Sequence, residues 1–294
     1  MLIVGKTNDY EYNTIQEALN VCNNNAIIHV YKGYYVENII INKQVSLIGE
    51  DKDNTIIDGG FQGNVIDIII ENVLISNITI QNANASLNNT DINAGLSIRS
   101  DNVTLNQCVF QNNAVGIQIS SNDNQIENCT FQDNVYGIFT LDSKRNSISN
   151  NFFQYNEKYG IHLYSGSSLN LVTRNFLSNN TFGMRIRAKN NIISYNIFSN
   201  NQKGLYVCCD STFNKIFLNN FQNNSIYNAR GNYHKNMWYL DSNVGGNYWS
   251  DYEGVDDNFD NIGDSSYFIL SREVNGTFEV VEDIYPLMTP IILN

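Results

Sequence analysis

Proline and charged residues are scarce in this chain. Only Pro286 and Pro290 occur among 294 residues, 16% of the residues are charged, and the formal net charge is -12. An acidic surface repels phosphate backbones, which excludes nucleic acid as a partner. Long apolar runs are also missing: residues 65–70 include an aspartate and are far too few to cross a bilayer. We therefore expect no membrane span.

The cysteines also give little sign of a metal site or a disulfide framework. The five cysteines show no CxxC spacing, so a zinc site is not expected, and an odd number does not fit a fully paired disulfide framework. Residues 1–10 lack a basic start followed by an apolar stretch. Either the protein is intracellular or a leader has been removed from it.

Asparagine is the abundant residue, with 52 copies. It tolerates the left-handed backbone conformation and is a poor helix former, so this density favours a fold with many tight corners. Low-complexity disorder is the other explanation for such a bias. The content of 42% hydrophobic and 12% aromatic residues argues against it.

A repeat runs through the middle of the chain. Glycine followed by alternating apolar residues recurs at intervals of 21, 21, 23, 23 and 21 residues, starting at Gly95, Gly116, Gly137, Gly160, Gly183 and Gly204. A second register places an aliphatic residue five positions before a phenylalanine and an asparagine three positions after it. Its members are Leu105, Phe110 and Asn113; Ile126, Phe131 and Asn134; Ile148, Phe153 and Asn156; Leu171, Phe176 and Asn179; Ile193, Phe198 and Asn201; and Ile216, Phe221 and Asn224.

This repeat predicts coils of about 22 residues, each with three short strands joined by tight corners. One coil cannot bury its apolar face alone, whereas stacking coils about 4.8 Å apart buries it and aligns like side chains in ladders. Stacked asparagines would bond along the axis and to the corner backbone. The sequence therefore predicts an all-β, single-stranded parallel β-helix over residues 1–240.

Two further segments frame these coils. Residues 14–20 predict a short helix, with Thr14 as N-cap and Glu17 completing a capping box, inside an N-terminal cap at about 12–24. Residues 83–93 predict a loop insertion, and residues 241–294 an irregular C-terminal capping segment. The helix would cover the open edge of the first coil.

The opening and the ending of the chain carry a family resemblance. Residues 12–19, 29–39 and 47–50 resemble the start of right-handed β-helix proteins of the pectate-lyase-like superfamily. The asparagine-rich coils, and the ending at 245–252, 263–264 and 283–287, resemble the NosD-like branch of archaeal surface proteins. The resemblance implies an extracellular or cell-surface location. It does not imply one activity, since the superfamily includes lyases, hydrolases, adhesins and non-catalytic modules.

By resemblance, the strand that starts at each repeat glycine forms the ligand groove. Its outward positions in coils three to six predict a carbohydrate-binding strip made of Phe139, His162, Tyr164, Arg185, Arg187 and Tyr206. Aromatic rings suit sugar faces and arginine suits acidic groups. A solvent face decorated with tyrosine and arginine is the alternative. The partner we expect is a polysaccharide or cell-envelope glycan.

Catalysis is weakly supported by the same strip. A glycoside hydrolase needs two carboxylates at the scissile bond, and none of the twelve outward positions two and four residues after the glycines is acidic. The candidate catalytic residues are His162, Arg185 and Arg187. We therefore favour a non-catalytic module that binds carbohydrate or contributes to the cell envelope, with a polysaccharide lyase or glycoside hydrolase as the alternative.

The sequence offers candidate ligands for two metals. Asp256, Asn258, Asp260 and Asp264, with the Ile262 carbonyl, resemble a calcium loop of the DxDxDG type and predict structural calcium in the C-terminal segment. An acidic surface loop is the alternative. NosD-type proteins are associated with copper delivery, so a copper maturation factor is the second alternative function. It is disfavoured because the three histidines (His29, His162 and His234) are far apart and Cys208–Cys209 is the only dense thiol pair.

Cys108 and Cys129 hold one register in adjacent coils, two residues before Phe110 and Phe131. We expect them to stack as a buried thiol ladder, at a spacing that also permits a disulfide.

Overall fold

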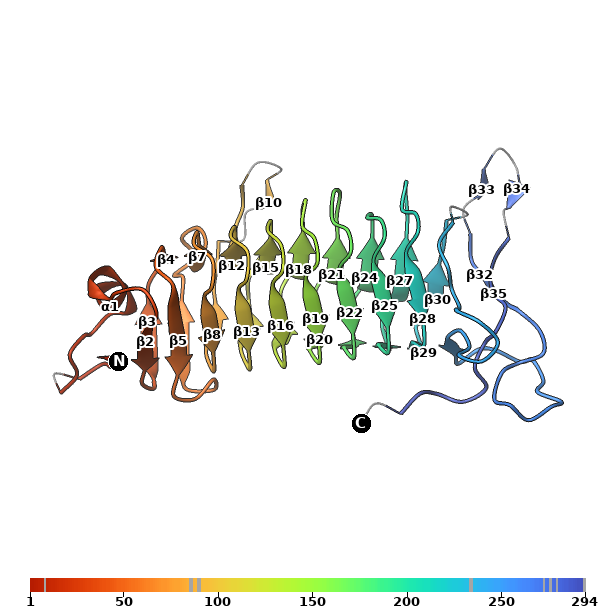
Figure 1. The fold of residues 1–294 in the computed structure, drawn as a ribbon, viewed down its shortest axis with the longest axis horizontal. Coiled ribbons are helices and arrows are strands. Elements are labelled where there is room, and N and C mark those ends of the chain that lie inside the picture. Colours follow the sequence, from red (N-terminus) through yellow and green to blue (C-terminus); the bar gives the residue numbers. More distant parts are fainter. Residues whose placement is uncertain are drawn as a thin grey trace.

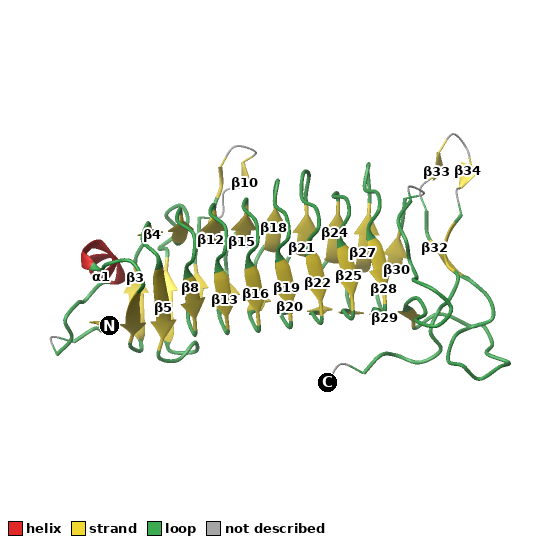
Figure 2. Cartoon of the chain, in the orientation of Figure 1, coloured by secondary structure: helices red, strands yellow, loops and turns green. Residues whose placement is uncertain are grey.

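The computed structural model describes residues 1–7, 9–84, 87–88, 91–232, 235–271, 273–274, 277–278 and 280–292. The chain winds into a right-handed parallel β-helix whose coils stack along the long axis of the molecule (Figure 1). Each coil contributes one strand to each of three parallel sheets, as the repeat predicted. Within the described residues α1 (Ile15–Val21) is the only helix, and it lies at the N-terminal end (Figure 2).

Two sheets of ten strands form two of the faces. Sheet 1 consists of β1 (Leu2–Val4), β2 (Ala26–Val30), β5 (Val45–Gly49), β8 (Leu74–Ser76), β13 (Thr104–Asn106), β16 (Gln125–Glu127), β19 (Ser147–Ser149), β22 (Leu171–Thr173), β25 (Ile192–Ser194) and β28 (Lys215–Phe217). Sheet 2 consists of β3 (Gly33–Val36), β6 (Thr55–Asp58), β9 (Thr79–Gln81), β14 (Val109–Gln111), β17 (Thr130–Gln132), β20 (Phe152–Gln154), β23 (Phe176–Ser178), β26 (Ile197–Ser199), β29 (Asn220–Gln222) and β31 (Tyr248–Trp249).

Sheet 3 has nine strands and contains the strands with the repeat glycines. Its members are β4 (Ile39–Ile41), β7 (Ile66–Ile68), β12 (Ala94–Ile98), β15 (Val115–Ile119), β18 (Tyr136–Thr140), β21 (Tyr159–Leu163), β24 (Phe182–Ile186), β27 (Lys203–Val207) and β30 (Tyr227–Arg230). Glycine is needed at the repeat position because a Cβ on Gly137 would lie 2.4 Å from the Gly160 carbonyl oxygen of the next coil.

Short antiparallel pairs complete the strands. They are β10 (Leu87–Asn88) with β11 (Asp91–Ile92), β32 (Tyr267–Ile269) with β35 (Val281–Asp283), and β33 (Glu273–Val274) with β34 (Thr277–Phe278). The predicted insertion at 83–93 therefore holds a small hairpin, although residues 85–86 and 89–90 of that prediction lie outside the described residues.

The helix has the predicted start. The Thr14 side chain accepts a hydrogen bond from the Glu17 backbone N–H, and the Glu17 carboxylate accepts one from the Thr14 N–H. Ile15, Ala18 and Leu19 are buried in the main core. The division at residue 240 into a β-helix and a cap stays a prediction.

A column of stacked rings fills the interior. Phe110, Phe131 and Phe153 stack with centroids 5.0 and 4.6 Å apart, and Phe198, Phe221 and Trp249 continue the column at 4.8 and 4.4 Å. The column is interrupted in the coil of β23, where Leu177 takes the inward place.

The predicted register is therefore wrong by one residue in that coil. Phe176 pairs with Phe152 rather than with Phe153, and Leu171 is 38% exposed while its neighbour Val172 is fully buried. Asn180, not Asn179, joins the asparagine ladder. The ladder asparagines explain the shift. Asn170, Asn175 and Asn180 follow one another at a spacing of five residues. Because Asn175 is held in its ladder, it fixes the position of β23, the strand that follows it.

Asparagines, most of them buried, form three ladders at the corners, whereas the sequence predicted one. In each ladder an asparagine side-chain oxygen accepts bonds from the backbone N–H and the side-chain amide of the asparagine one coil earlier. The ladders are Asn124, Asn146, Asn170, Asn191, Asn214 and Asn236; Asn151, Asn175, Asn196, Asn219 and Asn247; and Asn113, Asn134, Asn156, Asn180, Asn201 and Asn224. Polar groups that the corners would leave unpaired are thereby satisfied.

The C-terminal segment closes the last coil. Tyr267 stacks on Trp249 at 4.2 Å, which extends the ring column outward. Asp283 is fully buried and accepts hydrogen bonds from the Asn247 backbone N–H, the Trp249 indole N–H and the Tyr285 backbone N–H. Burial raises the pKa of the Asp283 carboxyl to about 6, although these bonds partly oppose the shift.

Candidate ligand-binding groove

The outer face of sheet 3 carries a groove with a volume of about 480 Å³. Side chains of β15, β18, β21 and β24 line it, and Ile92 of the β10–β11 hairpin lies at one end. Its lining residues are Ile92, Val115, Gln118, Tyr136, Phe139, Leu141, His162, Tyr164, Arg185 and Arg187. Five of the six predicted strip residues therefore meet in one groove.

The parallel register explains why they meet. Phe139 pairs with His162, His162 with Arg185, and Arg185 with Tyr206 in successive coils. Tyr206 does not line the groove itself but lies beside Arg185, whose guanidinium carbon is 5.7 Å from its ring centroid. Because the coils stack in register, residues that are 21 to 23 positions apart in the sequence lie side by side on one continuous surface.

Two residues of the predicted carbohydrate-binding strip are less exposed than the sequence predicted. Phe139 and His162 are buried, at 8% and 5% exposure, and form the floor rather than an outward face. Arg185 is half-buried and Arg187 is exposed. Charge therefore lies at the rim of the groove and apolar surface lies beneath it.

His162 is the most unusual side chain of the floor. Its ring lies among those of Tyr159, Tyr164 and Phe139, with centroids at 4.8, 5.3 and 5.5 Å. Both ring nitrogens are buried and have no hydrogen-bond partner among the described residues. Burial, followed by the charges of Arg185, Lys158 and Arg187, lowers the pKa of His162 to about 3. The ring is therefore neutral and offers one donor and one acceptor.

Positive side chains gather along this face. Arg185 and Arg187 donate from Nη1 to the hydroxyls of Tyr159 and Tyr164, both at 3.0 Å. Three lysines and arginines join them over aromatic rings: Lys158 over Tyr136 and Tyr159 at 5.4 and 5.6 Å, Lys203 over Phe182 at 4.3 Å, and Arg230 over Tyr206 at 5.9 Å. These contacts hold the cations in place, and the Arg230 guanidinium covers a face of Tyr206, one of the rings predicted to meet sugar.

None of these five cations forms an ion pair within the described part of the chain. The ion pairs found there join Lys52 to Asp53, Arg99 to Asp67, and Arg145 to Asp123, and none of these six residues lines the groove. In a chain of net charge -12, this leaves a local excess of positive charge on one face.

Sequence reasoning missed the residues just before the repeat glycines. Tyr136 lines the groove, and Tyr159 and Phe182 continue its row in the next two coils, with successive ring centroids 5.4 and 4.9 Å apart. Strict alternation from the inward Ile138 and Ile161 would have turned Tyr136 and Tyr159 inward. The alternation breaks at the glycine, while the register between the coils is kept on both sides of it: Tyr136 pairs with Tyr159 and Ile138 with Ile161. Their recurrence as aromatic residues in three successive coils was the available signal.

The groove has few side chains that could act as a catalytic acid or base. None of its described lining residues is an aspartate or glutamate, so it holds no carboxylate pair of the kind that glycoside hydrolysis uses. Burial alone would lower the pKa of Arg185, but its contacts with Cys208 and Tyr159 raise it above its usual value, which makes it a poor base. The arrangement suits binding.

The acidic loop at 256–264 lies in the C-terminal segment, away from the groove. Its carboxylates already accept backbone hydrogen bonds: Asp256 from Asp260 and Asn261, Asp260 from Ile262, and Asp264 from Asp257. Across the residues that the structure describes, no group of three or more His, Cys, Asp or Glu could hold a metal ion. Calcium binding through Asp256, Asn258, Asp260, Ile262 and Asp264 stays a prediction.

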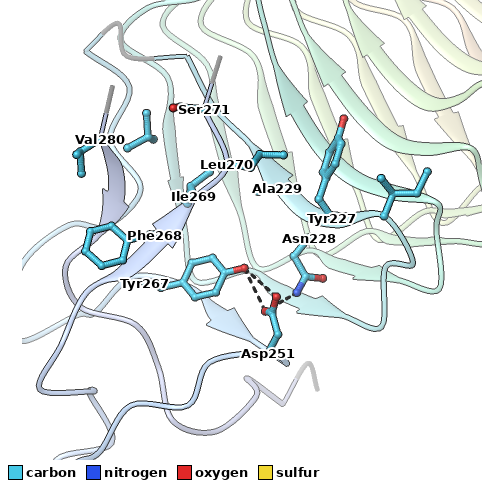
Figure 3. Close-up of a pocket in the computed structure, with 12 residues that line it drawn as sticks. Tyr227, Asn228, Ala229, Asp251, Tyr267, Phe268, Ile269, Leu270, Ser271 and Val280 are labelled. Atoms are coloured by element: carbon cyan, nitrogen blue, oxygen red, sulfur yellow. Dashed lines mark hydrogen bonds between the residues drawn. The ribbon is translucent and has the colours of Figure 1, made fainter. Parts of the chain in front are cut away.

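A second hollow, of about 490 Å³, lies between β30 and the C-terminal strands (Figure 3). Asp251 is its charged group, and it accepts hydrogen bonds from the Asn228 side-chain amide at 2.7 Å and the Tyr267 hydroxyl at 3.1 Å. Phe268, Leu270 and Val280 give its wall an apolar and exposed surface. Because its polar groups satisfy one another, this hollow supports no ligand assignment.

Cys108 and Cys129 are buried and free, and they occupy the positions that the second asparagine ladder takes in later coils. The thiol ladder is thereby confirmed.

His234 lies outside the described residues. Among the described residues no helix is long and apolar enough to cross a membrane.

Comparisons with known proteins agree with the fold. The family model described as "Periplasmic copper-binding protein (NosD)" matches residues 2–181 and 68–254. No curated protein matches the chain. DFA-IIIase from Arthrobacter chlorophenolicus A6 is similar in structure, with 13% identity over 84% of this chain and 75% of that one and a TM-score of 0.58.

Two other solved structures show the same likeness. Alginate lyase from Paenibacillus sp. str. FPU-7 has 14% identity over 80% of this chain and 95% of its own, with a TM-score of 0.54. The A-module of the mannuronan C-5 epimerase AlgE6 from Azotobacter vinelandii has 11% identity over 74% of each chain, with a TM-score of 0.54. At such identity the likeness concerns the fold alone.

Proposed function

Because the chain belongs to the NosD family and its interior is a packed core, we propose that it acts through the groove on sheet 3, as a non-catalytic module that binds acidic polysaccharide. The family description is periplasmic, and we place the protein outside the cytoplasm on that basis. An envelope or extracellular glycan is then the natural ligand.

The observation that carries this proposal is the excess of positive charge at the groove. Lys158, Arg185, Arg187, Lys203 and Arg230 lie on one face of an acidic protein without an ion-pair partner in the described chain. Guanidinium groups bind carboxylates with charge-assisted, often bidentate hydrogen bonds. The ligand that fits is a chain of sugars bearing carboxylates or sulfates.

The floor supports a sugar rather than a simple anion. His162 presents a neutral ring with two unpartnered nitrogens, which suits the hydroxyl groups of a sugar. Phe139, Val115 and Leu141 add apolar surface to the same groove, and such a site favours ligands that combine hydroxyls with apolar ring faces. Two of the similar structures are an alginate lyase and a mannuronan C-5 epimerase, which supports a glycan ligand.

Copper, which the family description names, fits the described residues poorly. Copper sites cluster His, Met or Cys, whereas His162 lies at the groove floor and Met184 is fully buried in the core. Cys208 and Cys209 are a pair without a third described ligand of the His, Cys, Asp or Glu type. We derive no copper chemistry from this chain.

The test is a binding assay with matched glycans. Polygalacturonate, and the same polymer with its carboxylates methyl-esterified, are compared in affinity electrophoresis at low and high salt. We expect retardation by the acidic polymer only, weakened by salt and by Arg185→Gln or Arg187→Gln. Arg174→Gln is the control, because Arg174 is exposed at a corner between sheets 1 and 2.

Equal binding of both polymers, or equal loss in the Arg174 control, would overturn the proposal. Shortened products in the same samples would instead assign the enzyme alternative.

A further inference from the structure

Two adjacent cysteines follow β27, next to the groove. The Cys209 thiol donates to the Cys208 sulfur at a distance of 3.1 Å, and Arg185 donates from Nε to the same sulfur at 3.3 Å. We propose that Cys208 and Cys209 are a reversible dithiol–disulfide site, and that its redox state sets the position of Arg185. The link to Arg185 matters for glycan binding only if the proposed function holds.

The backbone brings the two sulfur atoms together. In an extended strand adjacent side chains point to opposite faces, which would separate neighbouring cysteines. Cys209 instead has a φ of 61°, in the left-handed region. Hydrogen bonds fix the turn, because the Cys208 carbonyl accepts from the Ser211 hydroxyl at 2.6 Å and the Cys209 carbonyl accepts from the Asn232 side-chain amide at 2.9 Å.

Access favours Cys209 as the attacking thiol. Cys209 is exposed, whereas Cys22, Cys108, Cys129 and Cys208 are buried. It lines a hollow of about 500 Å³ together with three positive side chains, Lys144, Arg187 and Lys189, and one negative side chain, Asp210.

The oxidant we name is a small disulfide or a dithiol–disulfide oxidoreductase, as an oxidising compartment provides. The Cys209 thiolate attacks one sulfur of that disulfide, forms a mixed disulfide and expels one thiolate. The Cys208 thiol then loses its proton, its sulfur attacks the Cys209 sulfur, and the second thiolate leaves. The protein loses two electrons and two protons, and the oxidant is reduced to two thiols.

Geometry makes this disulfide easy to reduce again. Adjacent Cα atoms lie about 3.8 Å apart, whereas ordinary disulfides join Cα atoms about 4.4–6.8 Å apart. Strained disulfides have more oxidising potentials and belong to the labile class rather than the structural one. Ring closure also draws the Cys208 sulfur toward Cys209 and away from Arg185.

The experiment follows the two cysteines directly. The protein is incubated with oxidised or reduced glutathione, alkylated under native conditions, and cleaved with trypsin. Cleavage after Lys203 and Lys215 releases the peptide 204–215, which contains Cys208 and Cys209 and no other cysteine. We expect oxidised glutathione to remove two hydrogen atoms from this peptide, and dithiothreitol to restore both thiols.

A second readout is the affinity of polygalacturonate for each redox state. Loss of the bond that orients Arg185 is expected to weaken binding about fivefold in the oxidised protein. Cys209→Ser cannot close the ring and keeps Cys208 beside Arg185, so its affinity should not respond to oxidant. Cys129→Ser removes the other neighbouring thiol pair, with Cys108, and should respond like the unmodified protein.

The outcomes separate the two proposals. Two free thiols, or two bound glutathiones, on peptide 204–215 would overturn the disulfide site whatever the groove binds. A disulfide that leaves polygalacturonate affinity unchanged would overturn the link to Arg185. A disulfide in a protein that binds polygalacturonate in neither state would leave the thiol site standing and refute the proposed function.

Discussion

The asparagine ladders should supply a large share of the stability, and Asn175→Ala tests this at the centre of one ladder. Asn175 accepts from the backbone N–H and the side-chain amide of Asn151, both at 3.0 Å. Its own amide donates to the Ile148 carbonyl at 2.8 Å and to the Asn196 side-chain oxygen at 2.9 Å. All four bonds depend on the Asn175 side chain.

Their loss sets the expected magnitude. A buried N–H without an acceptor costs about 1–3 kcal/mol, and each of the other three lost bonds costs about 0.5–1.5 kcal/mol. We therefore expect Asn175→Ala to lower the free energy of unfolding by about 3–7 kcal/mol. This is a large fraction of the stability of an ordinary domain.

Urea denaturation followed by circular dichroism measures this loss. Asn243→Ala is the matched control, because Asn243 is exposed and its side chain joins no ladder, and it should change stability by less than about 0.5 kcal/mol. Equal effects of the two substitutions would refute the reasoning. They would mean that ring and aliphatic packing alone holds the coils together.

Three further perturbations test the account. Gly137→Ala should destabilise the protein by about 1–3 kcal/mol in urea denaturation, because its Cβ would press on the Gly160 carbonyl oxygen; an unchanged midpoint would contradict the close approach of the coils. His162 has a pKa of about 3 when folded and 6.5 ordinarily, so stability should fall as pH drops below about 6.5. Thermal melts of His162→Gln should show a smaller fall, and an equal one would count against a buried neutral ring. The folded pKa of Asp283 is raised from 3.8 to about 6, so its contribution of about 3 kcal/mol is present below about pH 4 and is lost as pH rises through 6. Asp283→Asn should lack that decline in urea denaturation at a series of pH values, and a decline of the same size would refute it.

Much of the fold was predictable because it repeats. The glycine-led strands, the inward phenylalanines and one asparagine ladder follow from intervals of 21 to 23 residues. The error at Phe176 has a physical cause: two adjacent apolar residues, Phe176 and Leu177, are both able to take the inward place, and Asn175 decides between them through its ladder. Counting asparagines at a spacing of five would have corrected it.

The groove was predictable in outline and not in detail. The register of repeats correctly brought Phe139, His162 and Arg185 into one column. It did not show that His162 is buried, or that Tyr159 packs against the His162 ring from the position before Gly160. These depend on local backbone geometry at the glycine and on the packing of aromatic rings, which alternation of side chains does not describe.

The central claim is that an acidic glycan lies in the groove over His162. Nuclear magnetic resonance of protein labelled with ¹⁵N in its three histidines (His29, His162 and His234) tests it most directly. On titration with an oligogalacturonate, we predict that both ring nitrogens of His162 shift while those of His29 do not, and that the methyl-esterified oligosaccharide moves neither. Binding of the oligogalacturonate without any shift at His162 would contradict the account, since the ligand would then lie elsewhere.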